Sequence, residues 1–232
     1  SLRELRIGWP VSRNTLGFII RELMRRNRLH DGLVYMQVTR GVARRDHAFP
    51  TTPVKPALVL TTKNTKHIVA DTGPGVAVKS QPDIRWGRCD IKTVALLPNV
   101  LAKQAARESG AYEAWLVDGK GCVTEGASTN AWIVTGEGEL VTRQTDNGIL
   151  AGITRHTLRS ICTSLQLKFV ERPFTLAEAK KAKEAFITSA TSFVTPVVKI
   201  DGDPVGDGKV GDMARRLREE YVRFSETGEA VT

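Results

Sequence analysis

AYEAWLVDGKGCVTEGASTNAWIVTGEGEL spans residues 111–140 and alternates between apolar segments and clusters of turn formers. DGKG at 118–121 separates two segments rich in β-branched and aromatic residues, a composition typical of a tight turn between antiparallel strands. A further turn signal, GEGE, follows at 136–139. The stretch therefore predicts a strand, a hairpin, a second strand and another turn.

Helical patterns lie on both sides of these strands in the sequence. Ser12 is an N-cap candidate for a helix running to about Leu29, because the apolar residues that follow it recur at three- and four-residue steps. Pro98 suits the first turn of a second helix, which Gly110 ends. Further helices are expected at 151–167, 176–185 and 211–223.

Strand patterns are interspersed with these helices. They are expected at 31–41, 56–62, 75–79, 168–175 and, as a strand and hairpin, 186–206. TTKNTKHIVADTGPG at 61–75 is polar and rich in turn formers, so it is the best candidate for a connection between domains. The order of elements predicts a mixed α/β protein.

Composition limits the class of protein. The 232 residues are enough to bury a core, and the longest apolar runs are far too short to cross a bilayer, so we expect a cytoplasmic protein with no membrane partner. Cys89, Cys122 and Cys162 are odd in number and widely separated, which argues against a disulfide framework.

The net charge of +9 favours anionic ligands in general. Much of the excess comes from 21–30 and 214–223, where the charges fall on the expected outer faces of helices without interleaved aromatic residues. We therefore expect no nucleic-acid partner.

Common catalytic motifs are absent from the sequence. Its four histidines make no HExxH or paired metal spacing, EGASTN is not a GxSxG elbow, and neither GxGxxG nor a Walker loop occurs. No metal site is expected. The remaining candidates for chemistry are a lysine, a glutamate and two loops.

Lys92 lies among Ile91, Val94, Leu96 and Leu97. Desolvation in such surroundings would lower its pKa and make it a nucleophile toward an aldehyde, whereas the alternative is an ordinary lysine that snorkels to water. Glu125 follows an expected strand and precedes a glycine, so its carboxylate can face a cofactor ring. The alternative is a plain turn glutamate.

Two segments have the composition of anion sites. In NGILAGITRHTLR (147–159), Gly152 allows close approach, and the backbone N–H groups of Ile153 and Thr154 open a helix. TSATS at 188–192 concentrates small and hydroxyl residues after a strand. The alternatives are a locally capped helix junction and a plain hydroxyl-rich turn.

RDHAFP at 45–50 places an arginine and a histidine two residues apart. If the segment is extended, Arg45 and His47 point to the same face and Asp46 to the other. That face would offer a planar cation beside a hydrogen-bond donor to something negative; an ordinary solvated pair is the alternative.

Five segments together resemble the fold type IV enzymes that use pyridoxal 5′-phosphate (PLP), and specifically the D-amino acid (D-alanine) aminotransferases. They occur in that family's order and spacing, and the resemblance covers essentially the whole chain. The segments are YMQVTRGVARRDHAFP, IRWGRCDIKTVALLPNVLAKQAA, VTEGASTNAWIV, ILAGITR and FITSATSFVTPV.

The resemblance implies a role for each candidate cofactor residue. Lys92 would bind PLP as a Schiff base and then move the proton between the substrate α-carbon and C4′ of the cofactor. Glu125 would pair with the pyridine nitrogen and keep it protonated. Leu150 would pack on the ring. The phosphate would be held by Gly152, Ile153 and Thr154 together with Ser189, Ala190 and Thr191.

The substrate side is implied in the same way. Arg45 and His47 match the pair that binds the α-carboxylate, for which the fork of an arginine is well suited. Tyr35 would line the pocket, with a core tyrosine as the alternative. In this family the pair comes from the neighbouring subunit, so the resemblance implies a homodimer.

Two departures from the family pattern accompany the resemblance. Relatives generally have a threonine at Ala190, so one hydroxyl contact to the phosphate is missing. The segment that brings a phosphate-binding arginine and an active-site tyrosine has no counterpart, so we expect a truncated small N-terminal domain at 1–66. A large PLP-binding domain at 67–232, a pseudo-barrel of β-sheets flanked by helices, is expected to follow.

The expected reaction is transamination between a D-amino acid, such as D-alanine, and a 2-oxo acid, such as 2-oxoglutarate, giving pyruvate and D-glutamate. The alternatives within the fold are a branched-chain aminotransferase and an aminodeoxychorismate lyase, and the Arg45 and His47 pair favours the D-amino acid enzyme over both. A truncated, catalytically silent cofactor-binding chain is the alternative of another class.

Overall fold

The computed structural model describes residues 1–65 and 71–227. The chain divides into two units, Ser1–Ile68 and Val69–Thr232. The domain boundary expected between residues 66 and 67 lies outside the described residues.

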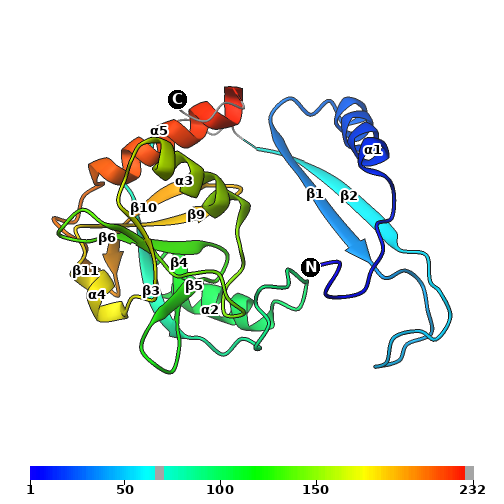
Figure 1. Ribbon diagram of the computed structural model, residues 1–232, viewed down its shortest axis with the longest axis horizontal. Helices are drawn as coiled ribbons and strands as arrows, with labels where there is room; N and C mark the ends of the chain where they lie inside the picture. The colour runs from blue at the N-terminus through cyan, green and yellow to red at the C-terminus, as the bar shows by residue number, and fades with distance from the viewer. Residues whose placement is uncertain (66–70, 228–232) are drawn as a thin grey trace. The chain divides into compact units, whose positions relative to one another are not determined.

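The first unit contains a helix and an antiparallel pair of strands (Figure 1). The side chain of Ser12 accepts a hydrogen bond from the N–H of Thr15 at 3.1 Å, which confirms the predicted N-cap. The helix ends before the predicted Leu29 because the chain turns at Arg28, which has a positive φ of 50°. The elements are α1 (Arg13–Arg26), β1 (Gly32–Thr39) and β2 (Ala57–Asn64), and β1 pairs with β2 over its whole length.

The second unit is built on a curled sheet with the strand order β5-β4-β3-β10-β9-β6-β7-β8, to which β11 adds beside β10. Strand β3 runs parallel to both of its neighbours and β7 runs parallel to β8, whereas the other pairs are antiparallel. The strands are β3 (Val76–Pro82), β4 (Glu113–Val117), β5 (Val123–Gly126), β6 (Asn130–Val134), β7 (Leu140–Thr142), β8 (Phe169–Glu171), β9 (Glu184–Ser189), β10 (Phe193–Ile200) and β11 (Asp203–Pro204).

The two edges of this sheet meet. The N–H of Val123 in the edge strand β5 donates to the carbonyl of Phe174 at 3.0 Å, and Cys122 forms a β-bridge with Thr175. Phe174 and Thr175 follow the other edge strand, β8. The sheet therefore curls into a pseudo-barrel, as expected, and β5 is held from both sides.

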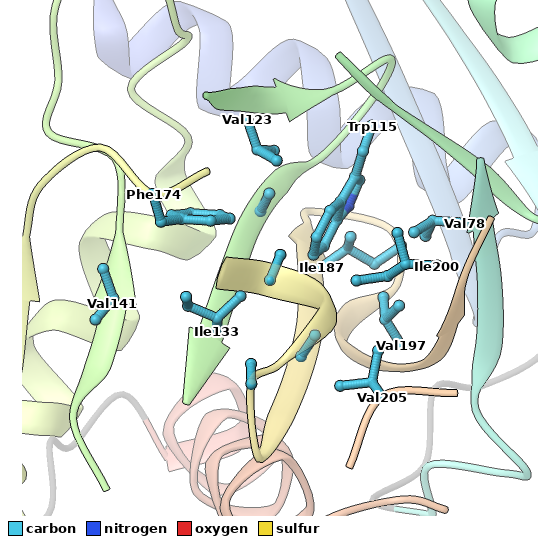
Figure 2. Close-up of a cluster of buried hydrophobic side chains, with 14 residues drawn as sticks. Val78, Trp115, Val123, Ile133, Val141, Phe174, Ile187, Val197, Ile200 and Val205 are labelled. Atoms are coloured by element: carbon cyan, nitrogen blue, oxygen red, sulfur yellow. The ribbon is translucent and has the colours of Figure 1, made fainter. Parts of the chain in front are cut away.

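Alternating side chains of the sheet pack into hydrophobic clusters on its two faces. The inner core contains Trp115, Ile133, Phe174 and Ile187 (Figure 2). On the opposite face of β6 and β9, Trp132 and Phe186 stack with ring centroids 5.5 Å apart, and α3 and α5 cover them. The helices are α2 (Leu97–Glu108), α3 (Ile153–Ser164), α4 (Leu176–Lys180) and α5 (Asp212–Thr227).

The helix that follows β8 is shorter than the sequence predicts. The expected helix at 176–185 ends at Lys180, and Ala185 instead belongs to β9, where it is buried and pairs with Ile133. The N–H of Lys183 already donates to Val134 at 2.8 Å. The strand pairing therefore outweighs the high helix propensity of these alanines and lysines. No helix in the described ranges is long and apolar enough to span a bilayer.

Candidate active site

Glu125 lies at the end of β5 in a buried pocket of hydrogen-bond donors. Its side chain is 7% exposed. Arg85 Nη1 donates to Oε1, Asn130 Nδ2 donates to Oε2 at 3.0 Å, and the N–H of Leu150 lies 3.2 Å from both oxygens. Three separate segments therefore hold one carboxylate. The alternative of a plain turn glutamate is wrong.

The groups around Glu125 have opposite effects on the pKa of its carboxyl group. Burial raises the pKa of Glu125 to about 7, although the charge and hydrogen bond of Arg85 and the N–H of Leu150 lower it; the negative charge of Asp83 raises it. A cation brought against this carboxylate would favour its ionised form. The pocket is therefore suited to holding a protonated ring nitrogen.

Arg85 and its partner Asp83 are site residues that the sequence analysis missed. Asp83 accepts from Arg85 Nε at 2.9 Å and from Nη2 at 2.8 Å, while Nη1 reaches Glu125. Asp83 and Arg85 point inward, whereas Ile84 and Trp86 between and after them are exposed. The alternation of charged and apolar residues in DIRW was the signal that could have revealed an inward-facing ion pair.

The turn leading into α3 is held next to Glu125. Asn130 Nδ2 also donates to the carbonyl of Leu150 at 3.0 Å. Gly152 is the N-cap of α3, and an added Cβ there would lie 2.3 Å from Asn130 Oδ1. Among the described residues no side chain caps this helix, so the N–H groups at Ile153 and Thr154 are available to an anion.

The loop after β9 reaches the same place. Thr188 pairs with Asn130 across β9 and β6, so residues 189–191 begin beside the residue that contacts Gly152. Ser189 Oγ accepts from the N–H of Thr191 at 3.3 Å. Ala190 and Thr191 are exposed. The two segments predicted as anion sites therefore converge around Asn130.

Lys92 does not have the buried surroundings that the sequence suggested. Its side chain is exposed, and so are the neighbouring Val94, Leu96 and Leu97; of the four apolar neighbours only Ile91 is buried. The expected desolvation of Lys92 within the chain is therefore wrong, because most of the apolar side chains around it face outward. Its segment is tied to the site, since the N–H of Cys89 donates to the carbonyl of Asn147 at 2.8 Å.

Arg45, His47 and Tyr35 all belong to the first unit. Arg45 and His47 are exposed. Asp46 Oδ1 accepts from the N–H groups of His47 at 2.6 Å and Ala48 at 3.3 Å, so the backbone turns and the reasoning from an extended strand does not apply.

Tyr35 lies on β1, where its hydroxyl donates to Gln37 Oε1 at 2.9 Å. Its side chain is about half exposed. The alternative of a core tyrosine is therefore wrong.

Comparisons with known proteins give a consistent result. The model of the amino-transferase class IV family matches residues 1–200. The chain is 42% identical over 224 residues to a D-alanine aminotransferase from Staphylococcus haemolyticus, covering 97% of this chain and 78% of that protein. It is 37% identical over 215 residues to the D-alanine aminotransferase of Listeria monocytogenes serotype 4b, covering 92% and 74%.

Solved structures share the fold. A branched-chain amino acid aminotransferase from T.th. with pyridoxamine 5′-phosphate has a TM-score of 0.85 and 27% identity, covering 98% of this chain and 75% of that one. A putative 4-amino-4-deoxychorismate lyase from Legionella pneumophila has a TM-score of 0.83 and 23% identity, covering 98% and 81%. The second match bears on the fold alone.

Proposed function

This chain belongs to the class IV aminotransferases, and from that membership we propose that it transfers the amino group of D-alanine to a 2-oxo acid such as 2-oxoglutarate. The observation that carries the choice of substrate is the similarity to D-alanine aminotransferases over nearly the whole chain. The branched-chain aminotransferases have the same fold at lower identity, so that alternative fits less well.

The chain is a PLP-dependent enzyme, and its residues fit this cofactor. The pocket has a buried carboxylate for a cationic ring nitrogen, and α3 starts at Gly152 without a side-chain cap. A side chain at Gly152 would clash with Asn130. When bound, PLP supplies an electron-accepting ring that stabilises the negative charge formed when the α-proton of the substrate leaves.

The proposed roles of the cofactor residues follow from their chemistry. The amine of Lys92 would hold the cofactor through its aldehyde carbon and, once the amine of the substrate has displaced it, would carry the proton that leaves the α-carbon. Glu125 keeps the ring nitrogen protonated, and Leu150 packs on the ring. The side chain of Lys92 is exposed in the single chain, so the proposed site would be shielded from solvent only when a neighbouring subunit covers it.

The phosphate site is proposed at the convergence of α3 and the loop after β9. The N–H groups of Ile153 and Thr154 would donate to the phosphate, and the absence of a side chain at Gly152 lets Asn130 lie against the start of the helix. Ser189 and Thr191 add hydroxyl groups, and Ala190 contributes only its backbone. The positive end of a twelve-residue helix favours the phosphate charge.

The substrate site is proposed to need a second copy of the chain. Arg45 and His47 bind the α-carboxylate of the substrate of the neighbouring subunit, and Tyr35 lines that pocket. A homodimer is supported by a group of apolar side chains near the start of α2 that are 55–68% exposed and would be covered by a second copy. They are Val94, Leu97, Val100 and Leu101.

A cytoplasmic location is also proposed. It is supported by the three free thiols of Cys89, Cys122 and Cys162, which a reducing compartment would preserve.

The test of function is pyruvate formation from D-alanine and 2-oxoglutarate by the PLP-loaded chain. D-alanine should give pyruvate much faster than L-leucine gives its 2-oxo acid, and D-glutamate should accumulate in equal amount. A faster reaction of L-leucine would instead indicate the branched-chain enzyme. If the absorbance of bound PLP does not change when D-alanine is added, the chain is the catalytically silent cofactor binder.

A further inference from the structure

Arg85 forms buried ion pairs with two carboxylates, those of Asp83 and Glu125. The side chains of Arg85, Asp83 and Glu125 are 6%, 11% and 7% exposed. The backbone N–H of Asp83 donates to the carbonyl of Val117 at 2.8 Å, which fixes the start of the segment. The guanidinium is therefore held between two carboxylates.

The donors of Arg85 are divided between these partners. Nε and Nη2 face both oxygens of Asp83, Nη2 also donates to the carbonyl of Gly148 at 3.0 Å, and Nη1 is left for Glu125. The hydroxyl of Thr124 donates to Asp83 Oδ2 at 2.7 Å. Because Asp83 fixes the guanidinium plane, it also fixes the direction from which Arg85 approaches Glu125.

The three groups together carry one net negative charge when both acids are ionised. Burial raises the pKa of Asp83, but its hydrogen bonds from Arg85 and Thr124 outweigh burial and leave that pKa below its ordinary value, so Asp83 is ionised at neutral pH. Arg85 and Glu125 alone would form a neutral pair. With Asp83 ionised, a cationic ring nitrogen would therefore meet a site of net negative charge, although the charge of Asp83 also raises the pKa of Glu125.

We propose that Asp83, acting through Arg85, is a positioning residue for Glu125: it fixes the guanidinium that orients the Glu125 carboxylate toward the protonated ring nitrogen of the cofactor. The inference rests on the proposed function. The competing explanation is a purely structural ion pair, which would affect the stability of the fold and leave the recognition of the ring nitrogen unchanged.

The experiment measures binding of pyridoxamine 5′-phosphate to the cofactor-free chain, together with its 1-deaza analogue, in which C–H replaces the ring nitrogen. Neither probe needs Lys92, because neither has an aldehyde. At pH 8 Glu125, with a pKa of about 7, is mostly ionised. We expect Asp83→Asn to weaken binding of pyridoxamine 5′-phosphate about tenfold and binding of the deaza analogue less than about twofold.

Asp90→Asn is the matched control. Asp90 lies on the same segment and pairs with Arg88 at 2.8 Å, so the variant removes the same charge and breaks an ion pair of similar length that is more exposed to solvent. It should leave the affinities for both probes near those of the unmodified chain. If Asp90→Asn weakened binding of pyridoxamine 5′-phosphate as much as Asp83→Asn does, the net charge of the protein, rather than Asp83, would be responsible for the loss of affinity.

A double-mutant cycle tests whether Asp83 acts through Glu125. In the Glu125→Gln background, Asp83→Asn should cause no further loss of affinity for pyridoxamine 5′-phosphate. Additive losses would overturn the proposal. Equal losses for the two probes would also overturn it, because they would not depend on the ring nitrogen.

Two controls distinguish a folding defect, and a failure of the proposed function, from a failure of this inference. Thermal unfolding is recorded for each variant, and Asp83→Ser replaces Asp83→Asn if the latter is unfolded; failure of both to fold would make Asp83 a structural residue. If the unmodified chain does not bind pyridoxamine 5′-phosphate, the proposed function fails together with the inference. Normal binding by the unmodified chain and an unchanged affinity of the Asp83 variant would remove the inference alone.

Discussion

Asn130 Oδ1 occupies the space that a side chain at Gly152 would need, at 2.3 Å from the position of the missing Cβ. The same asparagine donates to Glu125 and to the carbonyl of Leu150. Glu125 and the start of α3 are therefore positioned by one amide group, and a change at either place is transmitted to the other.

Gly152→Ala is expected to lower the free energy of unfolding by about 1–3 kcal/mol, because the new methyl group displaces Asn130 from both of its acceptors. Urea denaturation measures this. Gly136→Ala is the control, since no atom lies within 4 Å of its Cβ position. Equal effects of the two variants would contradict the proposed contact between Asn130 and position 152.

Glu125 is expected to make the stability of the cofactor-free chain depend on pH. Its pKa is 4.5 in the unfolded chain and about 7 when folded, so its contribution is fully present below pH 4.5 and is lost as the pH rises through 7. The loss is about 3 kcal/mol at most. Unfolding by denaturant between pH 4.5 and 8 measures it, and Glu125→Gln should remove this part of the dependence. Parallel curves for the two proteins would contradict it.

Lys92→Ala is expected to abolish transamination and leave the chain folded, because no other amine takes its place. Borohydride treatment of the loaded enzyme should fix the mass of the cofactor on the peptide containing Lys92 and not on that peptide in the variant. Lys120→Ala, in the exposed turn between β4 and β5, should keep full activity. Turnover by Lys92→Ala would remove Lys92 from the mechanism.

Arg45→Leu is expected to weaken productive binding of both amino and oxo acids by about 2–4 kcal/mol, because a contact to a desolvated carboxylate is lost. The value of kcat/KM for D-alanine measures this. Arg44→Leu removes the same charge from the neighbouring exposed residue and should have little effect. Similar kinetics of both variants would make Arg45 an ordinary surface residue.

Leu101→Glu is expected to shift the proposed homodimer toward monomers, because it places a charge among the exposed apolar residues of α2. Light scattering across a concentration series measures the mass. Gln104→Lys adds a charge to the same helix at an exposed residue that contacts Glu108, and it should leave the dimer intact. An unchanged mass of Leu101→Glu would place the contact surface elsewhere.

Local signals predicted most of the fold. Ser12 marks the start of α1 because N-capping depends on residues within one turn, and DGKG marks a turn for the same reason. The end of α4 could not be predicted in this way. Ala185 becomes a strand residue only because Ile133, far away in the sequence, lies beside it.

The candidate site also has features that short sequence patterns predict and features that depend on distant contacts. Glu125 and Gly152 are recognisable as short patterns, and the structure brings their surroundings together through Asn130. The surroundings of Lys92 were misjudged because sequence proximity to apolar residues does not say which way their side chains face. The turn at Asp46 depends on a side chain bonding to its own backbone, which interrupts the alternation expected of an extended chain.

The strand that carries Glu125 has hydrogen-bonded neighbours on both flanks, β4 on one side and the segment at Phe174 on the other. Its amide protons should therefore exchange with solvent only on the time scale of whole-domain opening. A chain that has lost its cofactor would then keep Glu125 in place, so that rebinding requires little refolding.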